Sequence, residues 1–442
     1  MTTAFDTVLR GGTLVTNSAI DVSDIGISNG QIAAIGNLSG VNTKEKIDAR
    51  GLHVFPGIID SQVHFREPGH EHKEDMESGS KAAVLGGVTT VFEMPNTTPP
   101  TTTAESFTEK LSRADGRYHC DYGFFVGACE ENIANLPTLE RLSGCVGVKI
   151  FMGSSTGTLL IPDDNMLKEV LLSGRRRAAV HAEDENRLKE RLPIRNSGGG
   201  PELHPQWRDV KTALLATERL VRLARTHRRP VHVLHVTTAD EINLLRKVRD
   251  IATVECTPQH LTLVAPDCYD QLGTYAQMNP PIRNEKHRQG LWQGILDGTV
   301  DVIGSDHAPH TQAEKDMDYP NSPSGMPGVQ TLLPIMLDHV NAGRLSLKRL
   351  VELTSTGPAR IYGAALKGEV KVGYDADLTL VDLGLKRTIS RDWLASKCGW
   401  SPFLDKTVKG WPVATILRGK TVMRDDEIIG DPIGKAVTFQ DP

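Results

Sequence analysis

The two ends of the chain share a pattern in which apolar and polar residues alternate. Residues 7–10 and 24–28 follow this period of two, and Asn29-Gly30 is a strong signal for a tight hairpin turn. The same alternation returns at residues 376–381 and 414–418. Because a short β-unit is only marginally stable alone, we expect both ends to pair into one small β-sandwich domain.

Between these ends, short apolar runs are separated by longer amphipathic segments. Eight runs have the length of a buried strand: 52–60, 89–94, 122–127, 147–152, 178–182, 231–236, 252–256 and 302–306. The intervening segments, such as 104–114 and 285–296, are long enough to be crossover helices. Eight strand–helix units close a barrel. We therefore predict an α/β fold, a TIM-like (β/α)8 barrel with the small β-sandwich domain formed from both chain termini.

This interpretation divides the chain into two domains. Residues 1–54 and 365–442 are assigned to the small β-domain, and residues 55–364 to the barrel. An open doubly wound sheet is the alternative, but no Gly-x-Gly-x-x-Gly follows the first apolar run. The barrel is therefore the preferred architecture.

Composition and charge restrict the partners. The 50 Lys and Arg residues against 55 Asp and Glu give a net charge of −5, so no global basic field favours nucleic acid or an anionic membrane. No apolar stretch approaches the roughly 18 residues of a membrane span, and the first six residues lack a leader pattern. We expect a cytoplasmic protein with a small-molecule substrate.

The six cysteines include no CxxC pair, which indicates reduced, structural thiols.

Polar residues at the ends of the apolar runs are the candidate site, because catalytic groups of a barrel project from the C-terminal ends of its strands. The candidate ligands are His64, His181, His235 and Asp306. Each alone has an ordinary interpretation as a hydrogen-bonded or capping residue. Together they come from four strands that only barrel closure would bring together, and they offer the nitrogen and oxygen ligands that Zn²⁺ accepts.

Lys149 lies inside the fourth apolar run, where burial of its charged side chain is energetically unfavourable. A charged ammonium beside a metal ion is unfavourable, and a salt bridge or a snorkelling lysine is the ordinary interpretation. Burial in the run would instead lower the pKa of Lys149 and leave a neutral, reactive amine. The residues alone leave both interpretations open.

Three longer segments carry a family resemblance. They are PGIIDSQVHFREPG (56–69), MPNT (94–97) and SDHAPH (305–310). Together with Asn279-Pro280-Pro281 they closely resemble the dihydroorotases of the amidohydrolase superfamily, and the match covers nearly the whole chain. The resemblance implies a TIM-like barrel whose two zinc ions are usually bridged by a carbamylated lysine, which here corresponds to Lys149. It also implies His64, His181, His235 and Asp306 as the remaining metal ligands. As a mechanistic hypothesis, we further assign the role of catalytic base to Asp306, because it lies at the end of the eighth predicted strand.

The resemblance further implies a reaction, the reversible interconversion of N-carbamoyl-L-aspartate and L-dihydroorotate in pyrimidine biosynthesis. Arg66, Asn96, Asn279 and His310 match substrate-binding positions. A planar guanidinium can hold the substrate carboxylate bidentately, whereas hydantoinases and allantoinases generally lack this arginine. Its ordinary alternative is an ion pair with Glu67. A hydantoinase or dihydropyrimidinase is the nearest alternative enzyme.

Gln62 departs from the family pattern, which has histidine at this position. An amide oxygen is a weaker Zn²⁺ ligand than imidazole, so the site is expected to hold one or two ions, with Gln62 a doubtful ligand. Gln259 is a smaller departure, at a place where histidine is common.

Some relatives that lost ligands are catalytically silent partners of aspartate transcarbamoylase, and this non-enzymatic role is the alternative from a different functional class. A homodimer or higher homo-oligomer is the default expectation.

One long segment is also a candidate part of the site. Residues 310–328 are rich in Pro, Gly and Ser and are expected either to cover the barrel mouth as a lid or to form an ordinary surface loop.

Overall fold

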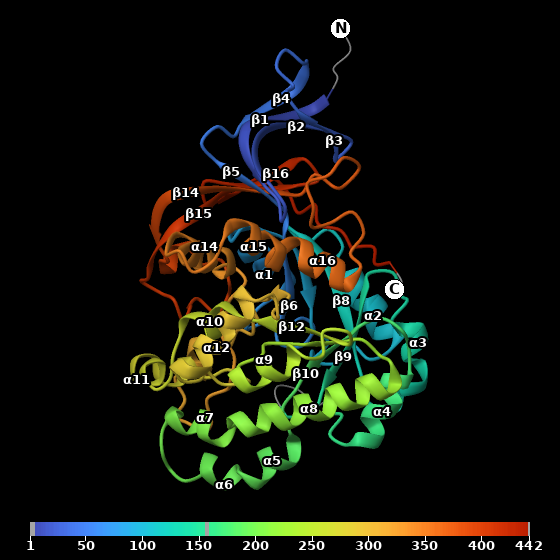
Figure 1. Ribbon diagram of the computed structural model, residues 1–442, viewed down its shortest axis with the longest axis vertical. Helices are drawn as coiled ribbons and strands as arrows, with labels where there is room; N and C mark the ends of the chain where they lie inside the picture. The colour runs from blue at the N-terminus through green and yellow to red at the C-terminus, as the bar shows by residue number, and fades with distance from the viewer. Residues whose placement is uncertain (1–4, 155–158, 441–442) are drawn as a thin grey trace.

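An eight-stranded parallel sheet forms the middle of the protein in the computed structural model, which describes residues 5–154 and 159–440 (Figure 1). Its strands, in spatial order, are β6 (Ile58–Val63), β7 (Val88–Glu93), β8 (Asp121–Gly127), β9 (Cys145–Phe151), β10 (Ala178–His181), β11 (Val231–Val233), β12 (Ala252–Cys256) and β13 (Val302–Ile303). The first strand meets the segment after the last one, where the backbone N–H of His64 donates to His307 O at 2.7 Å. The predicted barrel is confirmed, and it is nearly closed.

The α-helices lie around the barrel and at its mouth (Figure 1), and several of them pack against the outer face of its strands. They are α1 (Met76–Leu85), α2 (Ala104–Ala114), α3 (Leu136–Leu139), α4 (Asp164–Leu172), α5 (Glu185–Glu190), α6 (Leu192–Arg195), α7 (His204–Trp207), α8 (Val210–His227), α9 (Ala239–Leu245), α10 (Pro258–Thr262), α11 (Asp267–Leu272), α12 (Glu285–Leu296), α13 (Gln312–Lys315), α14 (Leu332–Asn341), α15 (Leu347–Val351) and α16 (Gly357–Tyr362). The strands are buried on both faces, which explains why they read as continuous apolar runs.

The two ends of the chain pair, as predicted, and they form one continuous mixed sheet. Its strands are β1 (Phe5–Val15), β2 (Ile20–Ser28), β3 (Gln31–Gly36), β4 (Thr43–Asp48), β5 (His53–Pro56), β14 (Leu378–Thr388), β15 (Thr407–Leu417), β16 (Lys420–Arg424) and β17 (Glu427–Ile428). The junction is β5, which is parallel to β1 and antiparallel to β14. The expected hairpin joins β2 to β3, where Asn29 and Gly30 have the positive φ angles of 52° and 79°.

The first apolar run, residues 52–60, differs from its prediction as a single strand. It contains the end of the terminal sheet and the start of the barrel, separated at Gly57. A Cβ atom at Gly57 would lie 2.3 Å from Thr89 Oγ1, so only glycine fits where the chain changes sheets. Because both strands are buried, hydrophobicity alone does not reveal the break.

A buried ion cluster joins the terminal sheet to the barrel. The Lys367 ammonium lies 2.5 Å from Asp121, at the start of β8, 2.6 Å from Asp377 and 2.9 Å from Asp375. Three carboxylates this close could suit a metal ion, since their oxygens lie within 4.8 Å of one another. The lysine already neutralises their centre, so we interpret the cluster as structural.

Two further expectations concern cysteines and membranes. All six cysteines are free, five of them buried and Cys129 partly exposed, as predicted. Among the described residues, no helix has the length and hydrophobicity required to span a bilayer.

Candidate active site

A small cavity lies at the C-terminal ends of the barrel strands. It is lined by Gln62, His64, Arg66, Asn96, Lys149, Phe151, His181, His235, Asn279, Asp306, Ala308, Ser324 and Gly325. The fold therefore brings together every predicted site residue except His310, which lies one layer back, behind Arg66. Strand ends and loops from distant parts of the chain therefore meet at this cavity.

On one side of the cavity, His64 faces Asp306. Its Nδ1 lies 2.8 Å from Asn96 Oδ1, which only accepts, so the ring proton belongs on Nδ1 and the lone pair on Nε2. That Nε2 lies 3.2 Å from Asp306 Oδ1. Burial lowers the pKa of His64 to about 4, so the ring is neutral at physiological pH. Two acceptors therefore face each other, an arrangement that a cation between them would stabilise.

On the other side, His181 faces His235. The Nε2–H of His181 donates to Glu183 Oε2 at 2.9 Å, which leaves the Nδ1 lone pair directed at His235 Nε2, 3.1 Å away. Burial lowers the pKa of both histidines. Burial alone would raise the pKa of Glu183, but the Arg208 guanidinium that contacts it lowers this pKa to about 2. Glu183 therefore stays ionised and holds His181 in the ligand tautomer.

These distances test whether a metal would fit. Two ligands of one tetrahedral Zn²⁺ lie roughly 3.3 Å apart, because each bond is about 2.0–2.1 Å. The His64–Asp306 and His181–His235 pairs match this spacing at 3.2 Å and 3.1 Å. Gln62 fits less well, since its Nε2 donates to Asp306 Oδ1 at 2.9 Å and its Oε1 has no partner in the described structure. The histidine and aspartate residues fit a metal centre, and Gln62 is its weakest member.

Lys149 lies in the same cavity wall and is 1% exposed. Within the described residues its Nζ forms neither a hydrogen bond nor an ion pair, and it lies 4.6 Å from the centre of the Phe151 ring. Burial lowers the pKa of Lys149 to about 7, against the opposing charges of Asp306 and Glu255. The salt bridge of the ordinary interpretation is therefore absent from the described structure, and a large fraction of the amine is neutral at pH 7.

Arg66 lies three residues after the end of β6 at Val63, and its backbone has a left-handed φ of 65°. Its Nε donates to Pro309 O at 3.0 Å, and its Nη2 lies 3.3 Å from His310 Nε2. The alternative ion pair with Glu67 does not form, because Glu67 pairs instead with Arg117 at 2.6 Å. Arg66 is 3% exposed, and among the described residues no carboxylate pairs with it. Burial lowers its pKa to about 10, so the group remains a cation.

Sequence reasoning missed the residues that support this site. Glu183 and Arg208 orient a predicted ligand, and Lys73 contacts His310. Glu183 follows His181 by two residues, which was the one available signal. Conversely, Gln259 does not border the cavity; its Nε2 donates to Ser305 O at 2.9 Å in the wall behind.

The 310–328 segment contributes to the site rather than forming only an exposed loop. It contains α13, and its residues Ser324 and Gly325 line the cavity. Lys315 is fully buried and anchors the segment by donating to Pro323 O at 2.7 Å.

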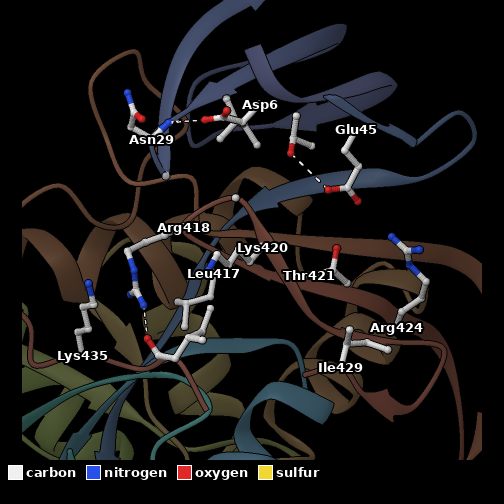
Figure 2. A pocket seen from close by; sticks show the side chains of 15 residues that line it. Asp6, Asn29, Glu45, Leu417, Arg418, Lys420, Thr421, Arg424, Ile429 and Lys435 are labelled. Atoms are coloured by element: carbon white, nitrogen blue, oxygen red, sulfur yellow. Dashed lines mark hydrogen bonds between the residues drawn. The ribbon is translucent and has the colours of Figure 1, made fainter. Parts of the chain in front are cut away.

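A larger hollow lies elsewhere, on the terminal sheet, and contains none of the predicted site residues (Figure 2). Its charged side chains include Asp6, Glu45, Arg418 and Lys420. Asp6 accepts from the Asn29 backbone at 2.8 Å, and Arg418 is committed to Asp121 and to a backbone carbonyl. The barrel cavity, where histidines, a lysine and carboxylates converge, is therefore the candidate active site.

Comparisons with known proteins agree with this geometry. The sequence pattern of the Amidohydrolase family matches residues 53–422. The chain is 37% identical over 431 residues to a dihydroorotase from Methanosarcina acetivorans, spanning 94% of this chain and 91% of that one. It is 35% identical over 460 residues to an allantoinase from Rubrobacter xylanophilus, spanning 99% and 98%. The solved structure of an L-hydantoinase from Arthrobacter aurescens has a TM-score of 0.94 at 31% identity, with 98% of this chain and 100% of that chain covered. The chain therefore belongs to the amidohydrolase family and is a metal-dependent hydrolase of cyclic amides.

Proposed function

We propose that this enzyme uses zinc to interconvert L-dihydroorotate and N-carbamoyl-L-aspartate, with ring closure as the direction that serves pyrimidine biosynthesis. One observation carries the choice of substrate: Arg66 borders the cavity as a buried cation without a carboxylate partner among the described residues. A buried cation without a paired carboxylate is unfavourable, and only the more distant carboxylates of Asp306, Glu314 and Glu74 offset the charge of Arg66. The carboxylate of dihydroorotate would supply the missing counter-charge in bidentate geometry.

Other proposed substrate-binding residues lie in or next to the same cavity wall. Asn96 and Asn279 border the cavity and offer amide groups to the ring. His310 Nε2 lies 3.3 Å from Arg66 Nη2, so one carboxylate can contact both groups. We assign Arg66, Asn96, Asn279 and His310 to substrate binding.

The proposed ligand set is His64, Lys149, His181, His235 and Asp306. When bound there, zinc supplies a Lewis acid that polarises the ring carbonyl and makes water more acidic. Lys149 can join the set after its neutral amine attacks CO₂: an N–C bond forms, a proton leaves, and the resulting carbamate is an anionic oxygen ligand. This modification answers the electrostatic objection to a lysine beside a metal.

Asp306 is the proposed general base and acid. Its carboxylate stands beside the cavity, 3.2 Å from His64 Nε2. It accepts a proton from the attacking water and gives it to the ring nitrogen as the C–N bond breaks. In the reverse direction the same carboxylate removes the proton from the ureido nitrogen.

Gln62 bears on the number of metal ions. The two ligand pairs provide two positions, but the position beside Gln62 lacks the second imidazole of the family pattern. We propose that the Lys149–His181–His235 position binds zinc more tightly than the His64–Asp306 position. The zinc content of the protein, measured by atomic absorption at increasing chelator concentration, tests this difference in affinity. Loss of both zinc ions at the same chelator concentration would contradict it.

The first experiment is steady-state hydrolysis of L-dihydroorotate by protein purified with zinc and bicarbonate, against a chelated control. Metal-dependent turnover is the expected result. Folded, zinc-loaded protein without turnover in either direction would contradict the proposal. It would favour a hydantoinase or a silent partner of aspartate transcarbamoylase, and Gln62→His would then test whether the missing ligand is the cause.

The substrate assignment has its own test in Arg66→Met. Truncating one member of a buried charge pair typically costs about 2–5 kcal/mol, so KM for dihydroorotate should rise at least about 30-fold. Discrimination against uncharged dihydropyrimidines should relax. Arg225→Met is the matched control, because that arginine is exposed and pairs with Asp250 at the surface. Unchanged kinetics in Arg66→Met would remove this residue from the site.

A further inference from the structure

His310 lies between two cations, Arg66 and Lys73. Its Nε2 is 3.3 Å from Arg66 Nη2 and 3.1 Å from Ser324 O, while its Nδ1 is 3.2 Å from Lys73 Nζ. His310 is 2% exposed. Burial, together with Arg66 and Lys73, lowers the pKa of His310 well below its usual value, so the ring is neutral and carries one proton.

The neighbours determine which nitrogen carries that proton. Lys73 Nζ and Arg66 Nη2 can only donate, and they face Nδ1 and Nε2 respectively, but the one acceptor within hydrogen-bond distance among the described residues, Ser324 O, lies at Nε2; the proton is therefore assigned to Nε2, and Nδ1 accepts from Lys73. In this tautomer Nε2–H donates to Ser324 O, and both ring nitrogens have suitable partners. The opposite tautomer would point Nδ1–H at the ammonium and leave Nε2 facing a carbonyl oxygen. The Nε2–H also faces the side on which Arg66 borders the cavity.

Glu314 makes this arrangement depend on Lys73. Its Oε1 lies 2.7 Å from Lys73 Nζ, and its Oε2 lies 3.9 Å from His310 Nδ1. Without the ammonium, the nearest charged group to Nδ1 would be this carboxylate, which can only accept. Glu314 Oε2, which also accepts from Thr311 N–H and Oγ1–H at 2.9 Å and 3.0 Å, would then compete with Ser324 O for the ring proton. A proton on Nδ1 would leave an Nε2 lone pair facing any bound carboxylate.

We propose that Lys73 is a positioning residue that keeps the proton of His310 on Nε2 and thereby makes the Arg66–His310 pocket selective for carboxylate-bearing ring amides. The inference rests on the proposed function and deepens it, because it assigns the substrate selectivity of that site to a residue that does not itself line the inner cavity. Lys73 lies in the outer entrance, which is also lined by Arg195 and Arg208.

The test compares a carboxylated ring amide with an uncharged one. KM and kcat are measured for L-dihydroorotate and 5,6-dihydrouracil in wild type, Lys73→Met, Lys73→Arg and the double variant Lys73→Met/Glu314→Gln. Lys81→Met is the matched control, a partly exposed lysine that pairs with Glu77. Folding of each variant is checked by its thermal midpoint.

We expect Lys73→Met to raise KM for dihydroorotate about 10- to 100-fold, the size of one lost hydrogen bond to a charged group, with a smaller change in kcat. Lys73→Arg, which also only donates, should stay within a few-fold of wild type. Adding Glu314→Gln to the Lys73→Met variant should recover much of the loss, because the amide can donate to Nδ1 and restores the tautomer. The control should match wild type, and KM for dihydrouracil should not move.

Other outcomes overturn the inference in distinguishable ways. If wild type hydrolyses dihydroorotate but Lys73→Met changes both substrates equally, or neither, the positioning role is wrong and the proposed function stands. Absence of rescue by Glu314→Gln, with all variants folded, also rejects the tautomer mechanism. If wild type does not act on dihydroorotate, the proposed function fails and this inference fails with it.

Discussion

Single protons decide what the residues of this cavity can do. His64 and His181 each direct one ring N–H to a fixed acceptor, Asn96 and Glu183, and turn the other nitrogen toward the cavity. The inward lone pair of His64 faces the Asp306 carboxylate, which is unfavourable unless a cation lies between them. The site is therefore organised for a metal before any metal binds, by hydrogen bonds one layer behind the ligands.

Asp306→Asn tests the proton-transfer role at this scale. Asp306 has a φ of 46°, a region that asparagine tolerates well, so the backbone should be preserved. Loss of a general base typically costs about 10²–10⁴-fold in rate, so kcat for dihydroorotate should fall by that factor while the zinc of the Lys149–His181–His235 position is retained. Asp297→Asn, at an exposed ion pair, is the control. A variant that keeps more than a few per cent of activity would reject the role.

Glu183 offers a second test, because it touches a ligand and not the substrate cavity. Glu183→Leu removes the acceptor of His181 Nε2–H, and losing such a partner typically weakens metal binding about 10- to 100-fold. Glu183→Gln keeps an acceptor and should lose less. Zinc competition with a chelating dye measures both variants. Glu185→Gln is the control, because Glu185 accepts a hydrogen bond from Ser154 N–H and, among the described residues, contacts no proposed metal ligand; this variant should bind zinc as wild type does. A Glu183→Leu variant with the zinc affinity of wild type would contradict the assignment.

At the scale of elements, helix α8 sets the position of Arg208. The helix begins after Asp209, whose carboxylate accepts from Thr212 N at 2.9 Å as the N-cap. The same first turn holds the segment behind His181, because the Asp184 N–H donates to Thr212 O at 3.0 Å. Capping therefore brings Arg208 to Glu183 across 25 residues of sequence.

Asp209→Ala should weaken this helix start. Losing an N-cap typically costs about 1 kcal/mol. Burial alone would raise the pKa of Asp209, but hydrogen bonds from Arg187 and Thr212 lower it to about 2, below the ordinary value of 3.8. A depressed pKa means that the carboxylate stabilises the fold fully above pH 3.8 and loses this contribution as pH falls toward 2. The thermal midpoint of the variant should therefore lie below wild type at pH 7, with a smaller difference near pH 3; an equal difference at both values would contradict the assignment.

At the scale of the whole molecule, two features join the chain ends to the barrel. The Lys367 cluster links the terminal sheet to β8. The last described segment closes the N-terminal end of the barrel, where Val437 and Phe439 pack in one buried cluster with Phe92 and Tyr362. The ends of the chain are therefore part of the structure that supports the site.

Lys367→Met tests the first of these links. The substitution would leave Asp121, Asp375 and Asp377 without their shared cation, and breaking a buried ion pair typically costs about 3–5 kcal/mol. The midpoint of urea unfolding should fall accordingly. Lys371→Met, at an exposed position nearby, should change it little. A metal bound at this cluster would instead make the loss depend on chelator, which the same titration with and without EDTA would reveal.

Much of this architecture was predictable because it rests on local patterns. The eight apolar runs predicted the barrel, the alternating ends predicted their shared sheet, and Asn29-Gly30 predicted its hairpin. The split of the first run at Gly57 was not predictable, because burial on both sides hides a change of sheet. The candidate ligands were identifiable because their side-chain chemistry stands out at the ends of apolar strands.

Side-chain polarity and spacing along the chain were sufficient to predict the eight barrel strands and the chemical groups of the site. The partners of those groups follow from the folded structure alone. Glu67 pairs with Arg117 and leaves Arg66 to the cavity, and Lys73 reaches His310 across 237 residues. The physical reason is that a proton's position and a charge's counter-ion depend on distances of about 3 Å between segments far apart in the chain. Such distances are set by barrel closure and not by local pattern.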